Sequence, residues 1–167
     1  MTSFLPQGGC VIGRDVVIEP GDPSSPEARA VLAAHLAFAH GNSPPEAVFA
    51  MDSSGLMASD VSFFCAREEA AVVAVGALRH LSPDHAEIKS MHTAAAYRGR
   101  GYARAMLEHL LEAARERGYP RVSLETGNTD AFAPARALYA AAGFTPCGRF
   151  GDYPESGFST FMTLELV

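Results

Sequence analysis

The chain has 167 residues, of which 48% are hydrophobic and 19% charged, a balance that predicts one globular domain over residues 1–167. The net charge of −6 argues against a nucleic-acid partner, and the longest apolar run, residues 70–78, is too short to cross a membrane. Three cysteines without a CxxC pair, and no signal-peptide pattern at the start, favour a cytoplasmic protein with free thiols.

The first elements are predicted from turn and cap residues. Residues 1–15 are glycine-rich and aperiodic, so we expect a loosely held start, and residues 16–18 form a short strand. Ser24 and Glu27 have the spacing of a capping box, which predicts the start of a helix. Apolar residues at helical spacing continue this helix, and Gly41 is its expected stop.

The next segments predict a short helix or turn and an antiparallel meander. Residues 43–46 repeat the capping pattern and predict a second, shorter helix or a turn near residues 47–51. Apolar runs at residues 61–66 and 71–78 flank an acidic turn and predict a hairpin. Residues 86–92 follow another turn as a third strand, so these strands should pair antiparallel.

The second half alternates helices and strands. A stripe formed by Met106, Leu107, Leu110, Leu111 and Ala114 predicts a core-facing helix after Gly101, and Gly118 is its expected end. Strands are expected at residues 121–125, 144–150 and 159–166, and a helix at residues 131–142 closed by Gly143. The strand at 121–125 follows a helical crossover, so it should lie parallel to the strand at 86–91. The fold class is therefore α/β with a mixed sheet: an antiparallel meander, then a β-α-β crossover, with helices on both faces.

The loop before this helix has the features of a phosphate site. Glycines at 99 and 101 let a ligand approach the main chain, and the first N–H groups of the helix attract an anion. A Gly-Lys-Ser/Thr sequence is missing, which excludes a P-loop, and Gly99-x-Gly101-x-x-Arg104 lacks the third glycine of a dinucleotide fingerprint. The bare motif would also suit a surface turn before an ordinary helix.

Two motifs resemble the GNAT N-acetyltransferase superfamily. Arg98-x-x-Gly101-x-Ala103 is similar to the family's acetyl-CoA loop, and Ala135-x-x-Leu138-Tyr139-x-x-x-Gly143-Phe144 is similar to the end of its later helix. They cover about residues 85–145, the expected acetyl-CoA-binding core.

The resemblance implies acetyl-CoA as co-substrate and a GNAT-like fold. It implies that the cofactor is bound by the loop residues Arg98, Gly99, Arg100, Gly101, Tyr102 and Ala103, by the strand edge Met91, His92 and Thr93, and by Asn128, Phe132 and Ala135. Many relatives carry asparagine where Phe132 stands, which puts one side-chain hydrogen bond to the pantetheine arm in doubt.

Catalysis by direct transfer to an amine requires a base and an acid. Glu87 stands where some relatives carry the base, although strand alternation also predicts an ion pair between Glu87 and Lys89. Glu125, at the end of the neighbouring strand, is the reserve base and an expected substrate-binding residue. The resemblance implies that Tyr139 gives a proton to the departing thiolate; the alternative is a core aromatic residue.

The acceptor site is expected in the last loop. Tyr153 and Ser159 lie among aromatic and polar residues that would suit a small primary amine or an amino acid, although an ordinary surface loop has the same composition. The six histidines show no metal-ligand spacing, so no metal is expected. We expect an N-acetyltransferase, and a homodimer is one expected partner state; the alternative is a non-catalytic acetyl-CoA sensor or structural module of the same fold.

Overall fold

The structure is a computed structural model that describes residues 10–12 and 16–166. Its elements, in chain order, are β1 (Cys10–Ile12), β2 (Val16–Pro20), α1 (Pro26–Asn42), the short 3-10 helix η1 (Pro45–Ala47), α2 (Ser53–Leu56), β3 (Val61–Glu68), β4 (Ala71–Ser82), β5 (His85–Thr93), η2 (Ala95–Tyr97), α3 (Tyr102–Glu116), β6 (Arg121–Gly127), η3 (Asp130–Phe132), α4 (Ala133–Ala141), β7 (Thr145–Pro146) and β8 (Ser159–Glu165).

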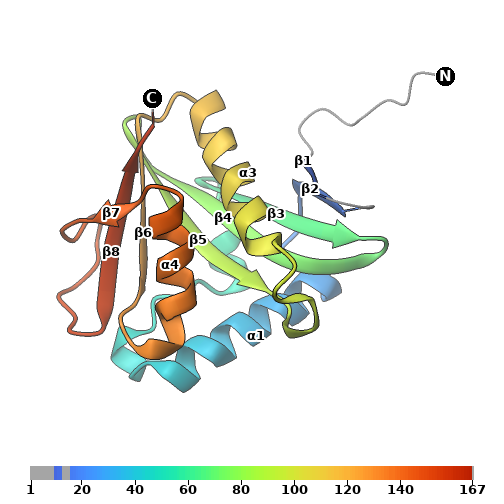
Figure 1. Ribbon diagram of the computed structural model, residues 1–167, viewed down its shortest axis with the longest axis horizontal. Helices are drawn as coiled ribbons and strands as arrows, with labels where there is room; N and C mark the ends of the chain where they lie inside the picture. The colour runs from blue at the N-terminus through green and yellow to red at the C-terminus, as the bar shows by residue number, and fades with distance from the viewer. Residues whose placement is uncertain (1–9, 13–15, 167) are drawn as a thin grey trace.

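Eight strands within the described residues form one mixed sheet in the order β1-β2-β3-β4-β5-β6-β8-β7 (Figure 1). Strands β3 to β5 form an antiparallel meander, as predicted, and β2 pairs antiparallel with the other side of β3. Helix α3 then connects β5 to β6, which lies parallel to β5 with Ile88 opposite Leu124. Strand β8 pairs antiparallel with the other side of β6. The predicted meander and β-α-β crossover are therefore confirmed.

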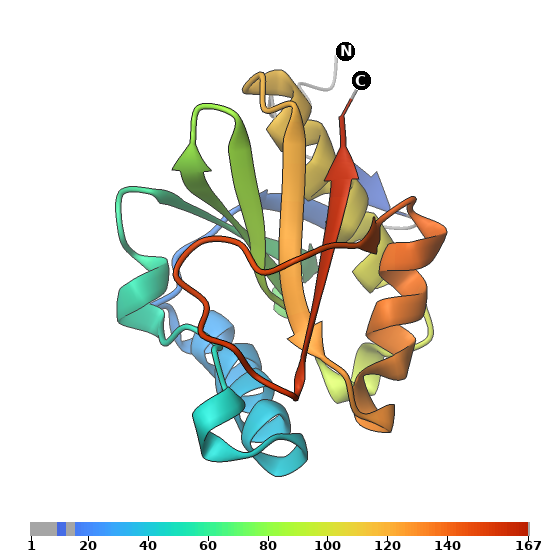
Figure 2. The same ribbon diagram turned by 90° about the vertical axis from the view of Figure 1, so that its left-hand side faces the viewer.

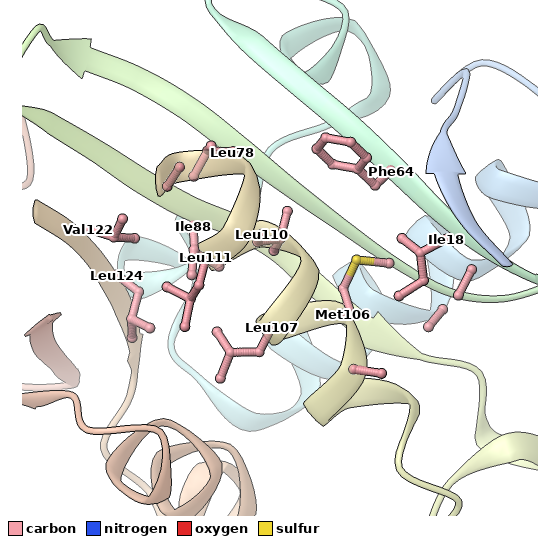
Figure 3. Close-up of a cluster of buried hydrophobic side chains, with 14 of the residues drawn as sticks. Ile18, Phe64, Leu78, Ile88, Met106, Leu107, Leu110, Leu111, Val122 and Leu124 are labelled. Carbon is pink, nitrogen blue, oxygen red and sulfur yellow. The ribbon is translucent and has the colours of Figure 1, made fainter. Parts of the chain in front are cut away.

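Helices cover both faces of the sheet, as Figure 2 shows with α1 and α2 on one side and α3 and α4 on the other. The two faces carry separate hydrophobic cores. On one face Val31 and Leu32 of α1 pack with Cys65 of β3. On the other, the predicted apolar stripe of α3 packs against strand residues that include Ile88 and Val122 (Figure 3). Alternating side chains of the central strands supply both cores.

Gly76 of β4 sets how closely α3 approaches the sheet. A Cβ atom at this position would stand 2.8 Å from Met106 Cγ and 3.1 Å from Leu110 Cδ1. Figure 3 shows both side chains pointing from α3 toward the strands. Because only glycine leaves room for them, this contact holds the helix, and with it the loop that precedes the helix, close to β4 and β5.

The start of α1 differs from the predicted capping box. The N-cap is Ser25, whose Oγ accepts a hydrogen bond from the main-chain N–H of Ala28 at 3.3 Å. Ser24 instead donates to Asp22 Oδ1 through its N–H and its hydroxyl group. The helix also continues one residue past its predicted stop at Gly41. Either of the two adjacent serines could have formed the N-cap. Because Ser24 donates to the carboxylate of Asp22, Ser25 is the residue that caps the helix.

Residues 47–51, where a short helix or a turn was expected, contain no α-helix. Only η1 forms there, without a side-chain cap, and Pro44 before it has an extended conformation with φ −60° and ψ 150°. The next helix, α2, begins after Asp52, whose Oδ1 accepts a hydrogen bond from the N–H of Gly55 at 2.8 Å. The expected cap at Ser43 does not form, because Pro44 rather than Ser43 precedes the first residue of η1.

The ends of the sheet also differ from the prediction. The strand expected at residues 144–150 is reduced to β7, although the N–H of Cys147 still donates to the carbonyl oxygen of Phe161 at 2.9 Å. Strand β1 lies within the segment expected to be loosely held, and pairs with β2. The remaining residues of that segment, 1–9 and 13–15, lie outside the described part of the chain.

Candidate active site

A bulge in β5 opens the sheet between β5 and β6. Between its pairs with Ala77 and Val75 of β4, strand β5 has one residue more than β4. Ser90, inside this bulge, has a φ of 56°, which is uncommon for a residue other than glycine. The pairing of β5 with β6 ends at Ile88 opposite Leu124, whereas β6 continues along β8. The two parallel strands therefore diverge beyond this pair.

The predicted phosphate loop lies at the start of α3. Gly99 and Gly101 have φ values of 75° and 87°, in the left-handed region that other residues adopt only with strain. Gly101 is the N-cap of α3, so the N–H groups of the first helical turn have no earlier carbonyl within the helix. A Cβ on either glycine would meet no atom within 4 Å. The glycines are thus required by the loop conformation, and the space beside them is open to a ligand.

A cavity of about 580 Å³ lies between the diverging strands and extends to this loop. This volume is within the usual range for a small-molecule site. Most of the predicted cofactor-binding residues line it: Met91, His92, Thr93, Arg98, Gly99, Gly101, Tyr102, Ala103, Phe132 and Ala135. Tyr139 and Glu125 line the same cavity. The fold thus brings residues of both sequence motifs to one place.

Five predicted site residues do not line the cavity: Glu87, Arg100, Asn128, Tyr153 and Ser159. The side-chain amide of Asn128 donates to the carbonyl oxygen of Gly157 at 2.6 Å. The guanidinium carbon of Arg100 lies 5.3 Å from the centre of the Tyr97 ring. The structure therefore gives these two side chains partners within the protein.

Glu125 is the carboxylate that reaches the cavity. It lies on β6 one residue beyond the last pair with β5, where the strands diverge. Burial raises the pKa of Glu125, and the nearby charge of Lys89 acts in the opposite direction. A half-buried carboxylate at this position can attract an ammonium group and accept its hydrogen bonds.

Tyr139 of α4 is a buried tyrosine, 8% exposed, that faces the cavity. Its ring packs edge-on against Phe144 with 5.9 Å between ring centres. Burial, with a smaller contribution from the charge of Glu125, raises the pKa of Tyr139 to about 12. The hydroxyl group therefore keeps its proton at neutral pH and can donate a hydrogen bond.

Glu87 takes part in a hydrogen-bonded chain behind the cavity. Its side chain is 1% exposed, and its Oε2 accepts a hydrogen bond from the Tyr153 hydroxyl at 2.5 Å. Lys89 Nζ donates to the oxygen of that same hydroxyl at 2.7 Å and to the carbonyl oxygen of Phe49 at 3.2 Å. The predicted ion pair of Glu87 and Lys89 is present at 3.9 Å, and Arg79 Nη1 lies 3.9 Å from the other carboxylate oxygen.

An aromatic wall that the sequence did not indicate closes another side of the cavity. His35 and Phe38 come from α1, His92 from β5 and Phe132 from η3. Ring centres lie 5.2 Å apart for His35 and His92 and 5.2 Å apart for Phe38 and Phe132. The Phe132 ring also lies against Gly127, where a Cβ would overlap it. The expected asparagine position is thus occupied by an apolar ring, and the histidine on α1 carried no recognisable spacing signal.

The described residues give little support for a metal site, a membrane-spanning helix or a reactive cysteine. No group of three or more His, Cys, Asp or Glu side chains could hold a metal ion in this part of the chain. Among the same residues, no helix combines the length and apolarity needed to span a bilayer. Cys65 is buried, and burial raises its pKa to about 11, so it remains a thiol at neutral pH.

Comparison with known proteins identifies the family. The model of the acetyltransferase (GNAT) family matches residues 29–144. An uncharacterized N-acetyltransferase of Bacillus subtilis, YsnE, is 40% identical over 124 residues, which are 74% of this chain and 82% of YsnE.

Solved structures share the fold. A Klebsiella pneumoniae protein assigned as an acyl-CoA N-acyltransferase superposes with a TM-score of 0.78 at 25% identity, covering 91% of this chain and 98% of that one. A GNAT family acetyltransferase of Elizabethkingia anophelis with acetyl-CoA bound has a TM-score of 0.70 at 17% identity, with 92% and 100% covered. The chain belongs to the GNAT family and is an acetyltransferase.

Proposed function

We propose that the protein transfers the acetyl group of acetyl-CoA directly to the primary amine of a small molecule or amino acid. The observation that supports this most is the shared cavity, which connects the start of α3 with Glu125 and Tyr139. The family uses acetyl-CoA, and the Elizabethkingia anophelis relative has it bound. The open loop at Gly99 and Gly101 suits the pyrophosphate, and the diverging edge of β5 suits the amides of the pantetheine arm.

Two ionisable groups of the cavity, Glu125 and Tyr139, fit the two ends of the reaction. Glu125 would hold the ammonium group of the acceptor beside the thioester. Tyr139, which keeps its proton at neutral pH, would donate a hydrogen bond or a proton to the thiolate that leaves. Glu87, first expected as the base, accepts a hydrogen bond from Tyr153 and does not line the cavity, which supports a role through Tyr153 rather than by direct contact with the acceptor.

The proposal is tested with a panel of primary amines and amino acids. Wild-type protein should release free thiol from acetyl-CoA only when an accepted amine is present, and mass spectrometry should find the acetylated amine. Tyr139→Phe and Glu125→Gln proteins that still bind CoA should show much less of both. A protein that binds acetyl-CoA but acetylates no amine in the panel would contradict this assignment.

A further inference from the structure

Lys89 is the only lysine of the chain. The other residues among the 13 lysines and arginines are all arginines. It lies in the candidate active site, where its side chain is 9% exposed and lines the cavity. An arginine cannot lose its proton in a protein, whereas a buried lysine can. Among the lysines and arginines, the one side chain that can act as a base is therefore located where the acceptor amine would bind.

The contacts of Lys89 form a continuous path for protons. Its Nζ donates to the Tyr153 hydroxyl oxygen at 2.7 Å, and that hydroxyl donates to Glu87 Oε2 at 2.5 Å. Each donor and acceptor is within the distance that proton transfer requires. Tyr153 can pass a proton on because its hydroxyl oxygen accepts from one side while its hydrogen points to the other.

Packing fixes the middle member of this path. The Tyr153 ring meets Phe49, Phe150 and Phe161 edge-on, with ring centres 5.3, 5.3 and 5.4 Å apart. These rings come from the segment after η1, the loop after β7, and β8. A loop residue held by three aromatic rings and two hydrogen bonds has one orientation, which keeps its hydroxyl between Lys89 and Glu87.

We propose that Lys89 takes the proton from the acceptor ammonium and that Tyr153 and Glu87 make this possible by removing the lysine's own proton. Lys89 gives a proton to the Tyr153 oxygen while the Tyr153 hydroxyl proton passes to Glu87 Oε2. The neutral Lys89 amine then takes a proton from the acceptor, which becomes a nucleophile. The net change is the movement of one proton from the acceptor to Glu87, and Lys89 and Tyr153 regain their starting forms. This inference rests on the proposed amine acetylation.

The charges around Lys89 are compatible with this cycle. Burial lowers the pKa of Lys89, and the charges of Glu87 and Glu125 partly oppose that effect, while Arg79 adds to it. Burial, with the neighbouring charge of Glu87, raises the pKa of Tyr153, so Tyr153 transmits protons without remaining as a phenolate. Lys89 is thus the catalytic residue of the three, and Tyr153 and Glu87 are positioning residues that act through it.

The test compares amines that differ in their need for a base. It uses two pairs of similar shape: phenethylamine with its β,β-difluoro analogue, and ethylamine with trifluoroethylamine. The fluorinated member of each pair loses its ammonium proton far more easily and arrives largely as the free amine at neutral pH. With the non-fluorinated member, Lys89→Arg and Tyr153→Phe should reduce kcat by about 10²–10⁴-fold, the range of a general base. With the fluorinated member the loss should be much smaller, and higher pH should reduce the loss for the ordinary amine.

A second measurement does not depend on activity. Because the chain has one lysine, labelling with ¹³C-lysine gives a single Cε resonance whose shift reports the protonation of Lys89. We expect its titration midpoint below the ordinary lysine value of about 10.4. A Lys89 that stays protonated to the ordinary value would overturn the proposal. Variants that bind CoA normally but lose activity equally with both members of a pair would also overturn it. A wild-type protein that acetylates no amine while its lysine titrates early would contradict the proposed function instead.

Discussion

His35 of α1 and His92 of β5 approach each other with 3.3 Å between their Nδ1 atoms, so one imidazole donates a hydrogen to the other. Both are neutral in the folded protein. Burial lowers the pKa of each to about 4, and for His35 the nearby His92 and Lys89 add to the effect. The aromatic wall of the cavity therefore carries no positive charge that would repel an ammonium acceptor.

The histidine pair should make the protein less stable in acid. Between about pH 6.5 and pH 4 the unfolded chain binds protons that the folded chain excludes, so the free energy of unfolding should fall as the pH decreases through this window. For His35 the shift corresponds to roughly 3 kcal/mol at most. Urea unfolding across this range should show a smaller decrease for His35→Gln than for wild type. The exposed residue His40 on the same helix is the control, and His40→Gln should retain the wild-type slope.

Gly101 and Gly118 lie at opposite ends of α3 with similar left-handed backbones, φ 87° and 81°, and open space where a Cβ would be. Valine at either position should cost at least about 1–2 kcal/mol of stability. Only Gly101→Val should also weaken CoA binding, because the added side chain would enter the phosphate site. Calorimetry of the two folded variants makes the comparison. Equal CoA affinity in both would exclude this loop as the binding site.

Tyr139→Phe keeps the buried ring and removes only the hydroxyl group. We expect kcat to fall by about 10²–10⁴-fold, the range for a positioned proton donor, while affinity for CoA and thermal stability change little. Tyr119→Phe is a matched control, since it removes a tyrosine hydroxyl that contacts His80 far from the cavity lining. Normal turnover in Tyr139→Phe would make this residue part of the core only.

Glu125→Gln should raise the KM for the acceptor amine more than it changes kcat. Because burial raises the pKa of Glu125, the wild-type carboxylate should take up a proton above the ordinary glutamate range as pH falls. The wild-type KM should therefore rise with decreasing pH, and the variant should lack this rise. Glu108→Gln, at an exposed position of α3 paired with Arg104, should behave as wild type. A pH-dependent loss of kcat in Glu125→Gln would instead indicate that Glu125 itself takes the proton.

The sequence predicted those parts of the fold that depend on neighbouring residues. The apolar stripe of α3, its glycine boundaries and the hairpin strands are local patterns, and the structure has them. The sequence was less informative where two neighbouring residues could play the same role. Both Ser24 and Ser25 could cap α1, and Ser25 does so because Ser24 donates to Asp22. Alternation along β5 correctly predicted that Glu87 and Lys89 would share a face.

Contacts between distant segments could not be predicted in the same way. Tyr153 lies 66 residues after Glu87 in the sequence, and only the return of the last loop across the sheet brings them together. The bulge at Ser90 has no signal in residues 85–93 either, because it depends on how β5 pairs with β4. The cofactor loop could thus be predicted from the sequence, whereas the proton path and the aromatic wall could be identified only in the folded structure.

The close contact at Gly76 links resistance to heat with affinity for CoA, two properties that often vary independently in enzymes. Met106 and Leu110 rest on this glycine, and α3 carries the loop with Gly101 at its start. Helix and strand thus form one rigid body, and any side chain at position 76 would lift the helix and move its first turn away from β5. Changes that loosen the core there should reduce resistance to heat and affinity for CoA together, so selection for either property constrains the other.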